Sequence, residues 1–257
     1  MKRNLRIEDE KIISEFCRQE ALESFYHYFP LMYAISESTH QLKIDEQDNV
    51  WADDEELYIE GVAILEEPEK VKKIWVTLQK APWGWKSELY DVNFVYDLKT
   101  TLQIKNFRKN VKKFLRDNGR LSYGEPFDSK ECWEVVKTWY EKSNRKAFTD
   151  FGYTKWLIEN YHRFNPIHPR VVSRDGKPLA LSLWGELTEE TAIHLICKDV
   201  RVPYLQDYIR HMTYSEMLEK GFETVNDGGN CGEQGIDVFK QKLRPKFILP
   251  VWSWIRV

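Results

Sequence analysis

The last hundred residues alternate strand-like and helix-like segments in an order that few folds accommodate. Residues 169–199 contain three apolar runs separated by the turn signals DG and TEE, which indicates three strands joined by hairpins. Residues 204–221 have helical spacing and end at a glycine, which commonly closes a helix. A strand, a short helix and a final strand follow, at 222–229, 235–243 and 247–257. The order β-β-β-α-β-α-β predicts an α/β (α+β) fold in which helices flank a mixed, mostly antiparallel sheet.

The first half of the chain has a comparable order of helix, strands, helix and strand, although it shares no sequence identity with the second half. We therefore expect two similar units, residues 1–100 and residues 101–257. The elements predicted outside the last hundred residues are helices at 8–20, 24–35 (broken by Pro30), 68–79, 101–119, 129–144 and 150–163, and strands at 41–52, 56–65 and 91–98.

Composition excludes several classes of protein. Hydrophobic residues make up 42% of the 257, which is enough for a packed core. The 38 Lys and Arg nearly balance the 41 Asp and Glu, so the chain does not coat nucleic acid by net charge, although a local basic patch remains open. No run approaches the roughly 20 apolar residues of a membrane span, and no secretory leader is visible. The four cysteines lack the spacing of a zinc site, so we expect reduced thiols, no metal and a cytoplasmic location.

The helix predicted at 101–119 places an apolar stripe opposite a row of cations. Thr101 is its expected cap and Gly119 its expected end. Arg108, Lys109 and Lys112 belong to the cationic face, which few acidic residues interrupt. Two interpretations stay open: a surface for a polyphosphate or RNA backbone, or an ordinary solvated face.

Two segments resemble a known family. The sequence NDGG followed by GIDVFKQKLRP, within residues 226–245, resembles the ending of the Fem-type peptidyltransferases and of the phosphatidylglycerol lysyltransferase C-terminal domain. The sequence YDLKTTLQIKNFRKNVKKFL, residues 96–115, resembles the strand and basic helix that open the same domain. Both relatives are a branch of the GNAT acyltransferase superfamily. The resemblance covers about residues 90–257 and implies tandem GNAT-like units with the active cleft in the second.

The resemblance also implies an activity: transfer of an acyl or aminoacyl group from an activated carrier to an amine or hydroxyl acceptor. The donor would be aminoacyl-tRNA or an acyl-coenzyme A thioester, with no tightly bound cofactor. Acetyl-CoA enzymes of the superfamily grip pyrophosphate with a glycine-rich loop before a helix. The corresponding residues here, 196–211, contain no glycine, and Pro203 lacks a backbone donor. An acetyl-CoA-dependent N-acetyltransferase and a non-catalytic GNAT-like binding module remain the alternatives.

Candidate site residues follow from the same resemblance. Lys240 matches the position that contacts the reacting carbonyl or phosphate, and Phe239 matches its pocket-shaping neighbour. Lys242 and Arg244 would extend the positive surface toward donor phosphates. The alternative for this helix is a row of exposed lysines that contribute little to stability.

The remaining candidates surround the glycine-rich corner. Asp227 is placed either to act on the acceptor as a base or to form an Asx-turn. Gly228, Gly229 and Gly232 are expected to adopt positive φ and to let the neighbouring strands splay. Trp184 is a candidate for the acceptor pocket, with burial in the core as its alternative.

Overall fold

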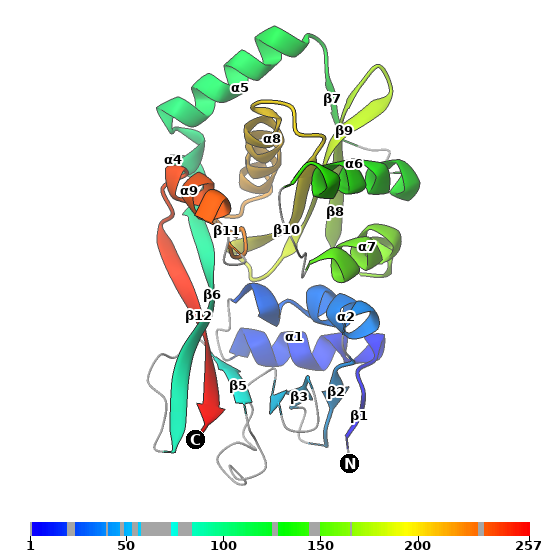
Figure 1. Ribbon diagram of the computed structural model, residues 1–257, viewed down its shortest axis with the longest axis vertical. Helices are drawn as coiled ribbons and strands as arrows, with labels where there is room; N and C mark the ends of the chain where they lie inside the picture. The colour runs from blue at the N-terminus through cyan, green and yellow to red at the C-terminus, as the bar shows by residue number, and fades with distance from the viewer. Residues whose placement is uncertain are drawn as a thin grey trace.

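The architecture was obtained as a computed structural model, which describes residues 2–19, 24–39, 41–46, 49–52, 56–57, 73–76, 84–124, 128–143, 150–164, 166–230 and 234–257. One twisted sheet runs through both halves of the chain (Figure 1). Its strand order is β1-β2-β3-β4-β5-β12-β6-β11-β10-β9-β8-β7. The strands are β1 (Arg3–Asn4), β2 (Lys43–Ile44), β3 (Val50–Trp51), β4 (Glu56–Leu57), β5 (Lys73–Val76), β6 (Trp85–Asp97), β7 (Ser122–Gly124), β8 (Ile167–Arg174), β9 (Lys177–Glu186), β10 (Thr191–Asp199), β11 (Thr224–Asn226) and β12 (Phe247–Arg256).

The sheet is mixed and mostly antiparallel, as predicted. Among the described strands, only β4 with β5 and β10 with β11 pair in parallel. The long antiparallel pair of β6 and β12 joins the halves, because β12 also pairs with β5 and β6 also pairs with β11. The sheet therefore continues across residue 100, and the division into two GNAT-like halves at that residue stays a prediction.

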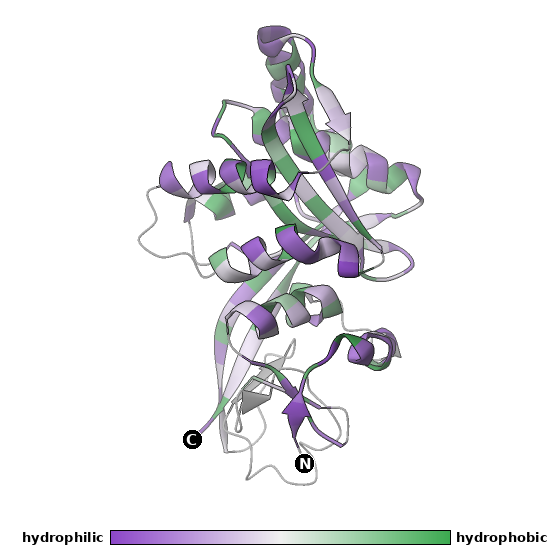
Figure 2. Ribbon diagram, turned by 90° about the vertical axis from the view of Figure 1, so that its right-hand side faces the viewer, coloured by the Kyte–Doolittle hydropathy of each residue, from purple (hydrophilic) through white to green (hydrophobic). Residues whose placement is uncertain are grey.

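Helices cover both faces of the sheet. Along β9, the side chains of Leu181 and Leu183 join one apolar cluster with α6, while Ala180 and Trp184 face α8, as the alternation of a strand requires. Figure 2 shows hydrophobic strands between helices with hydrophilic outer faces. The helices are η1 (Ile7–Asp9), α1 (Glu10–Gln19), η2 (Phe25–His27), α2 (Phe29–Ser38), α4 (Leu98–Leu102), α5 (Lys105–Asn118), α6 (Ser129–Glu141), α7 (Phe151–Asn160), η4 (Tyr161–Arg163), α8 (Leu205–Glu219) and α9 (Gln234–Lys242).

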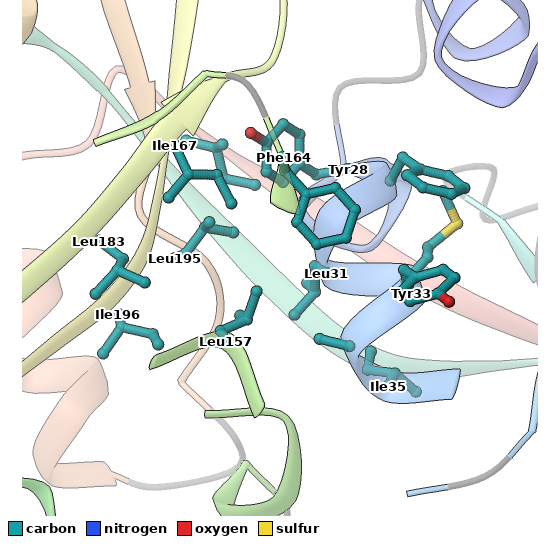
Figure 3. Packing of buried hydrophobic residues seen from close by; sticks show 14 of the residues in the cluster. Tyr28, Leu31, Tyr33, Ile35, Leu157, Phe164, Ile167, Leu183, Leu195 and Ile196 are labelled. Atoms are coloured by element: carbon teal, nitrogen blue, oxygen red, sulfur yellow. The ribbon is translucent and has the colours of Figure 1, made fainter. Parts of the chain in front are cut away.

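The largest apolar cluster fixes the N-terminal half to the second half. Leu31 and Tyr33 of α2 lie in the same buried cluster as Leu157 of α7 and Leu195 of β10 (Figure 3). Phe164 packs edge to face against Phe29, with ring centroids 6.2 Å apart. Because this core is continuous, the elements that both halves contribute to their junction are held at fixed positions.

Four local predictions need correction. Pro30 lies in the first turn of α2 and so begins a helix rather than breaking one, because the first helical amides need no intrahelical partner. Residues 73–76, expected in a helix, form β5; the rest of 68–79 is outside the described residues. The helix predicted at 101–119 is divided into α4 and α5. Asp97 caps α4 by accepting a 2.8 Å bond from Thr100 N, so Thr101 is not the cap; Gly119, at φ 68°, does end α5.

Within the part of the chain that the structure describes, no helix combines the length and the apolar character needed to cross a membrane.

Stability is expected to fall in mild acid because of a buried histidine. Burial lowers the pKa of His27 to about 4. The unfolded chain takes up this proton near pH 6.5, so the contribution is complete above that pH and is lost as the pH falls toward 4. Between pH 7 and 5, His27 should remove about 2 kcal/mol from the free energy of unfolding.

Urea unfolding of His27→Gln at both pH values tests this, because glutamine does not titrate. The variant should show a pH dependence smaller by that amount, while the same change at exposed His162 should leave it as in the wild type. An unchanged pH dependence for His27→Gln would contradict the assignment.

Candidate functional site

A cavity of about 570 Å³ lies where β10 and β11 separate. The two strands pair only as far as Ile193 with Asn226, and β10 then continues to Asp199. Beyond Asn226 the chain follows β6 instead, with Asp227 N donating to Phe94 O at 3.0 Å. The splay expected beside the glycine-rich corner is therefore present. The cavity is lined by residues from η2, β6, α6, α7, β10, α8 and α9, so both halves contribute to it.

Gly228 and Gly229 are needed for different structural reasons. Gly228 has φ 66°, and a Cβ there would lie 3.0 Å from the ring of Phe25. Gly229 does not show the positive φ that was expected; instead, a Cβ there would clash directly with the carboxylate of Asp91. Gly228 thus permits the turn, and Gly229 permits the close approach of β6. Gly232 lies outside the described residues.

Asp227 is the centre of a buried charged cluster. Its carboxylate lies 2.9 Å from His194 Nδ1, 3.2 Å from Arg210 Nε and 3.8 Å from Lys240 Nζ. These partners come from β10, α8 and α9, and Asp227 itself is only 5% exposed. The Asx-turn expected at Asp227 is formed by its neighbour, since Asn226 Oδ1 accepts a 2.9 Å bond from Gly228 N.

The cluster fixes the protonation of its members. Burial alone would raise the pKa of Asp227, but Arg210, then Lys240 and His194, outweigh it and hold that pKa well below its ordinary value. Burial lowers the pKa of His194, which keeps its imidazole neutral at neutral pH. The cluster therefore carries one negative and two positive charges.

Lys240 is buried, which corrects the expectation of an exposed helix lysine. It is 5% exposed, and its ammonium donates to the carbonyl oxygens of Asp227 and, at 2.9 Å, of Gly228. The Tyr96 hydroxyl donates to Lys240 O at 3.1 Å, which supports the end of α9. Lys240 therefore contributes to folding as well as lining the cavity.

The order Ser182, His194, Asp227 was not singled out from the sequence, yet the structure brings the three together. His194 Nε2 lies 2.8 Å from Ser182 Oγ, and Thr213 donates to Ser182 Oγ at 3.2 Å. The arrangement has the connectivity of a nucleophilic triad. Ser182 is fully buried and does not line the cavity, however, so the hydroxyls orient the imidazole rather than attack a substrate.

The cavity lining includes a second buried carboxylate, Asp91 of β6, which lies against Gly229. Tyr26 donates its hydroxyl to Asp91 Oδ2 at 2.8 Å, and Val92 N donates to Oδ1 at 2.8 Å. Burial, and then the Asp91 charge, raise the pKa of Tyr26 well above its ordinary value, so its hydroxyl keeps its proton. Asn93 fixes this wall by accepting a 2.7 Å bond from Phe25 N. No sequence pattern had indicated Asp91 or Tyr26.

A third group lies beside α6 and α7. Lys198 donates to Asp150 Oδ2 at 2.7 Å and sits 3.6 Å from the ring centroid of Trp139. Asp150 Oδ1 is buried without a hydrogen-bond partner among the described residues. Arg201 lies at the exposed edge of the same group, 5.4 Å from the Trp139 ring.

The other predicted residues do not all line the cavity. Phe239 lines the cavity beneath Arg210, whose guanidinium lies 5.0 Å from its ring centroid. Lys242 and Arg244 are exposed outside it. Trp184 is in the core, with its ring centroid 4.0 Å from that of His168, and does not line the cavity. The basic residues Arg108, Lys109 and Lys112 are exposed on α5, which lies at the end of the molecule remote from both termini (Figure 1).

Comparison with solved structures identifies the fold. A conserved protein of unknown function from Bacteroides thetaiotaomicron matches with a TM-score of 0.78 and 14% identity, over 100% of this chain and 99% of that one. The C-terminal domain of a protein from Agrobacterium fabrum, assigned as a lysylphosphatidylglycerol synthetase, matches with a TM-score of 0.66 and 14% identity, over 98% and 91%. FemX matches with a TM-score of 0.62 and 8% identity, over 100% and 97%.

These similarities confirm the resemblance at the level of fold. The chain has the GNAT-like fold that FemX and the synthetase domain share. No family model matches the chain, and no curated protein matches it in sequence.

Replacing Gly229 should show how closely the chain at Gly229 packs against Asp91 of β6. Gly229→Ala places a methyl group against Asp91 and should lower the melting temperature by several degrees, roughly 1–3 kcal/mol of overpacking. Gly235→Ala, in the first turn of α9 with open space around its Cα, is the control and should leave the melting temperature unchanged or raise it.

The double variant Asp91→Ala/Gly229→Ala tests whether the clash with the Asp91 carboxylate causes this loss of stability. Removing the carboxylate should recover most of the loss, so the two changes should be non-additive in thermal unfolding. Additive losses would show that Gly229 is needed for another reason.

Proposed function

We propose that the protein is an acyltransferase that moves an acyl or aminoacyl group from an activated carrier to an amine or hydroxyl acceptor. The observation that carries the proposal is the cluster of Arg210, Lys240 and Asp227, whose net positive charge is buried beside a cavity at the splay of β10 and β11. A fixed positive charge in a poorly hydrated site stabilises an oxyanion more than the same charge in water.

The roles follow from the contacts. Lys240 and Arg210 would stabilise the charge that develops on the acyl oxygen as the acceptor attacks. The bond from the acceptor nitrogen or oxygen to the acyl carbon forms, and the carrier's C–O or C–S bond breaks. The acceptor loses a proton and the carrier's oxygen or sulfur gains one. Asp227 is too weak a base for this proton because its pKa is so strongly lowered, so we assign it to positioning Lys240 and Arg210.

An aminoacyl-tRNA donor fits the surroundings better than coenzyme A. Before α8, the amide of Arg201 already donates to the carboxylate of Asp199, and Pro203 has no amide to offer to a pyrophosphate. Burial raises the pKa of Asp207, yet an acid in the first turn of α8 still opposes an anion there. The exposed cations of α5 instead offer a surface for the phosphates of a larger carrier.

Removal of the Lys240 ammonium should separate an enzyme from a binding module. In Lys240→Met, turnover with charged tRNA and a panel of amines should fall by roughly 100-fold or more, as for loss of an oxyanion-stabilising group. The melting temperature should also fall, because two backbone carbonyls and Asp227 lose a partner. Activity is therefore compared at a temperature where circular dichroism shows both proteins folded.

Gln241→Ala is the matched control, since Gln241 is the next residue of α9 and is exposed. It should keep both activity and melting temperature. Full turnover by folded Lys240→Met would remove Lys240 from the mechanism.

Charge reversal on α5 should distinguish the donors. Lys109→Glu/Lys112→Glu should weaken tRNA binding by at least about 10-fold in fluorescence anisotropy and flatten its salt dependence, because fewer phosphate contacts form. The control is Lys130→Glu/Lys155→Glu, which reverses two exposed lysines on other helices. It has the same net charge as Lys109→Glu/Lys112→Glu and should have little effect on tRNA binding. Thermal stabilisation of the wild type by acetyl-CoA, without any binding of tRNA, would favour the N-acetyltransferase alternative.

A further inference from the structure

Asp91 is a buried carboxylate on the cavity wall to which no cation in the described part of the chain is paired. It is 8% exposed and lines the cavity. Its hydrogen bonds come from a tyrosine hydroxyl and a backbone amide, which are neutral donors. Asp227, which lines the same cavity, has two cations and a histidine around it. Buried charges are normally paired, so a buried carboxylate such as Asp91 would be expected to have a cationic partner.

Several features of the fold serve to place this carboxylate. Asp91 pairs with Val251, but Leu89 pairs with Trp252, so Tyr90 is an extra residue on β6. Such a bulge changes the direction of the side chains that follow it. Gly229 then leaves room for the carboxylate, and Tyr26, whose ring lies 5.9 Å from that of Tyr90, holds it in orientation.

The surroundings of Asp91 suit an organic cation. Phe25, Tyr26 and Tyr153 provide aromatic surface on the same side of the cavity, and aromatic faces attract ammonium groups. Asp150, with one carboxylate oxygen unpartnered among the described residues, adds a second acceptor to the lining. The same cavity is lined by Arg210 and Lys240 beside Asp227 and by Lys198 beside Asp150, so Asp91 is the lining carboxylate that has no paired cation among the described residues.

We propose that Asp91 and Tyr26 form a subsite for a primary ammonium group of the substrate. The inference rests on the proposed function and deepens it: the molecule that enters the cavity carries a cation at one end and its reacting acyl or acceptor group at the other. The ammonium binds Asp91, and the reacting group then lies toward Lys240. The same chemistry is offered by the α-ammonium of an aminoacyl donor and by an amine-bearing acceptor.

Binding of small probes tests the subsite without any transfer reaction. Glycinamide and L-alaninamide carry the free ammonium of an aminoacyl group, and their N-acetyl derivatives lack its charge. By saturation-transfer NMR and competition, the two amides should bind the wild-type protein and the acetylated forms should not. Asp91→Asn should weaken the amides by about 10- to 100-fold, the effect of losing a charge-assisted bond. Ethanolamine represents an amine-bearing acceptor. Tighter binding of the two amides than of ethanolamine would assign the ammonium to the aminoacyl donor, and tighter binding of ethanolamine would assign it to the acceptor.

Stability measurements separate a binding role from a folding role. Asp91→Asn should keep or raise the melting temperature, because it removes an uncompensated buried charge and keeps an acceptor for Tyr26. Tyr26→Phe keeps the charge and should weaken the amides less than Asp91→Asn does. Asp117→Asn, on the exposed face of α5, is the control and should bind the probes as the wild type does.

Two outcomes overturn the inference: no binding of any free-ammonium probe by the wild type, or equal binding by wild type and folded Asp91→Asn. Failure of the proposed function looks different. In that case the ammonium probes bind through Asp91, but no carrier, whether charged tRNA or acyl-CoA, supports turnover.

Discussion

The pairing of Asp227 with Arg210, Lys240 and His194 determines the geometry on which the cavity depends. The four residues come from separate elements that meet where β10 and β11 part, and each would otherwise leave a buried polar group unsatisfied. A buried charged cluster is tolerable only when all its partners are present, and breaking one contact costs about 3–5 kcal/mol. The ammonium of Lys240 therefore ties α9 to the segment that follows β11, beside the splay.

The cavity belongs to both halves of the chain because the sheet and the main core run through both. Asn93 accepts hydrogen bonds from Phe25 N and from Ser24 Oγ, at 2.7 and 3.3 Å, which holds η2 against β6. The apolar cluster that includes α2, α7 and β10 also packs the N-terminal half against the second half. The N-terminal half thus supplies a wall of the site as well as support for it, and that wall carries aromatic groups and a carboxylate rather than cations.

The sequence predicted those features that local patterns encode. The hairpin at Asp175 and Gly176 and the splay near Gly228 were foreseen, because turn residues and glycines act within a few positions. The resemblance pointed to Lys240, but its burial was not foreseeable, since the carbonyls that bind it come from a loop that precedes α9. Asp91 gave no signal, because its orientation depends on a bulge opposite β12, far along the chain. The division of the helix at 101–119 was missed because Asp97, before the helical pattern begins, caps α4.

Asp227 and Asp91 are both buried, but their electrostatic surroundings differ. The first is surrounded by cations that lower its pKa, so its charge stabilises the folded state fully above the pKa of the unfolded chain, and this contribution is lost as the pH falls toward the lowered pKa. The second is oriented by a bulge, a glycine and a tyrosine, none of which neutralises its charge. Folding gains nothing from burying a carboxylate without a cation, so a ligand that brings the cation adds free energy that folding alone does not supply. An ammonium-bearing substrate would then be selected by the same uncompensated charge at Asp91 that contributes nothing to the stability of the fold.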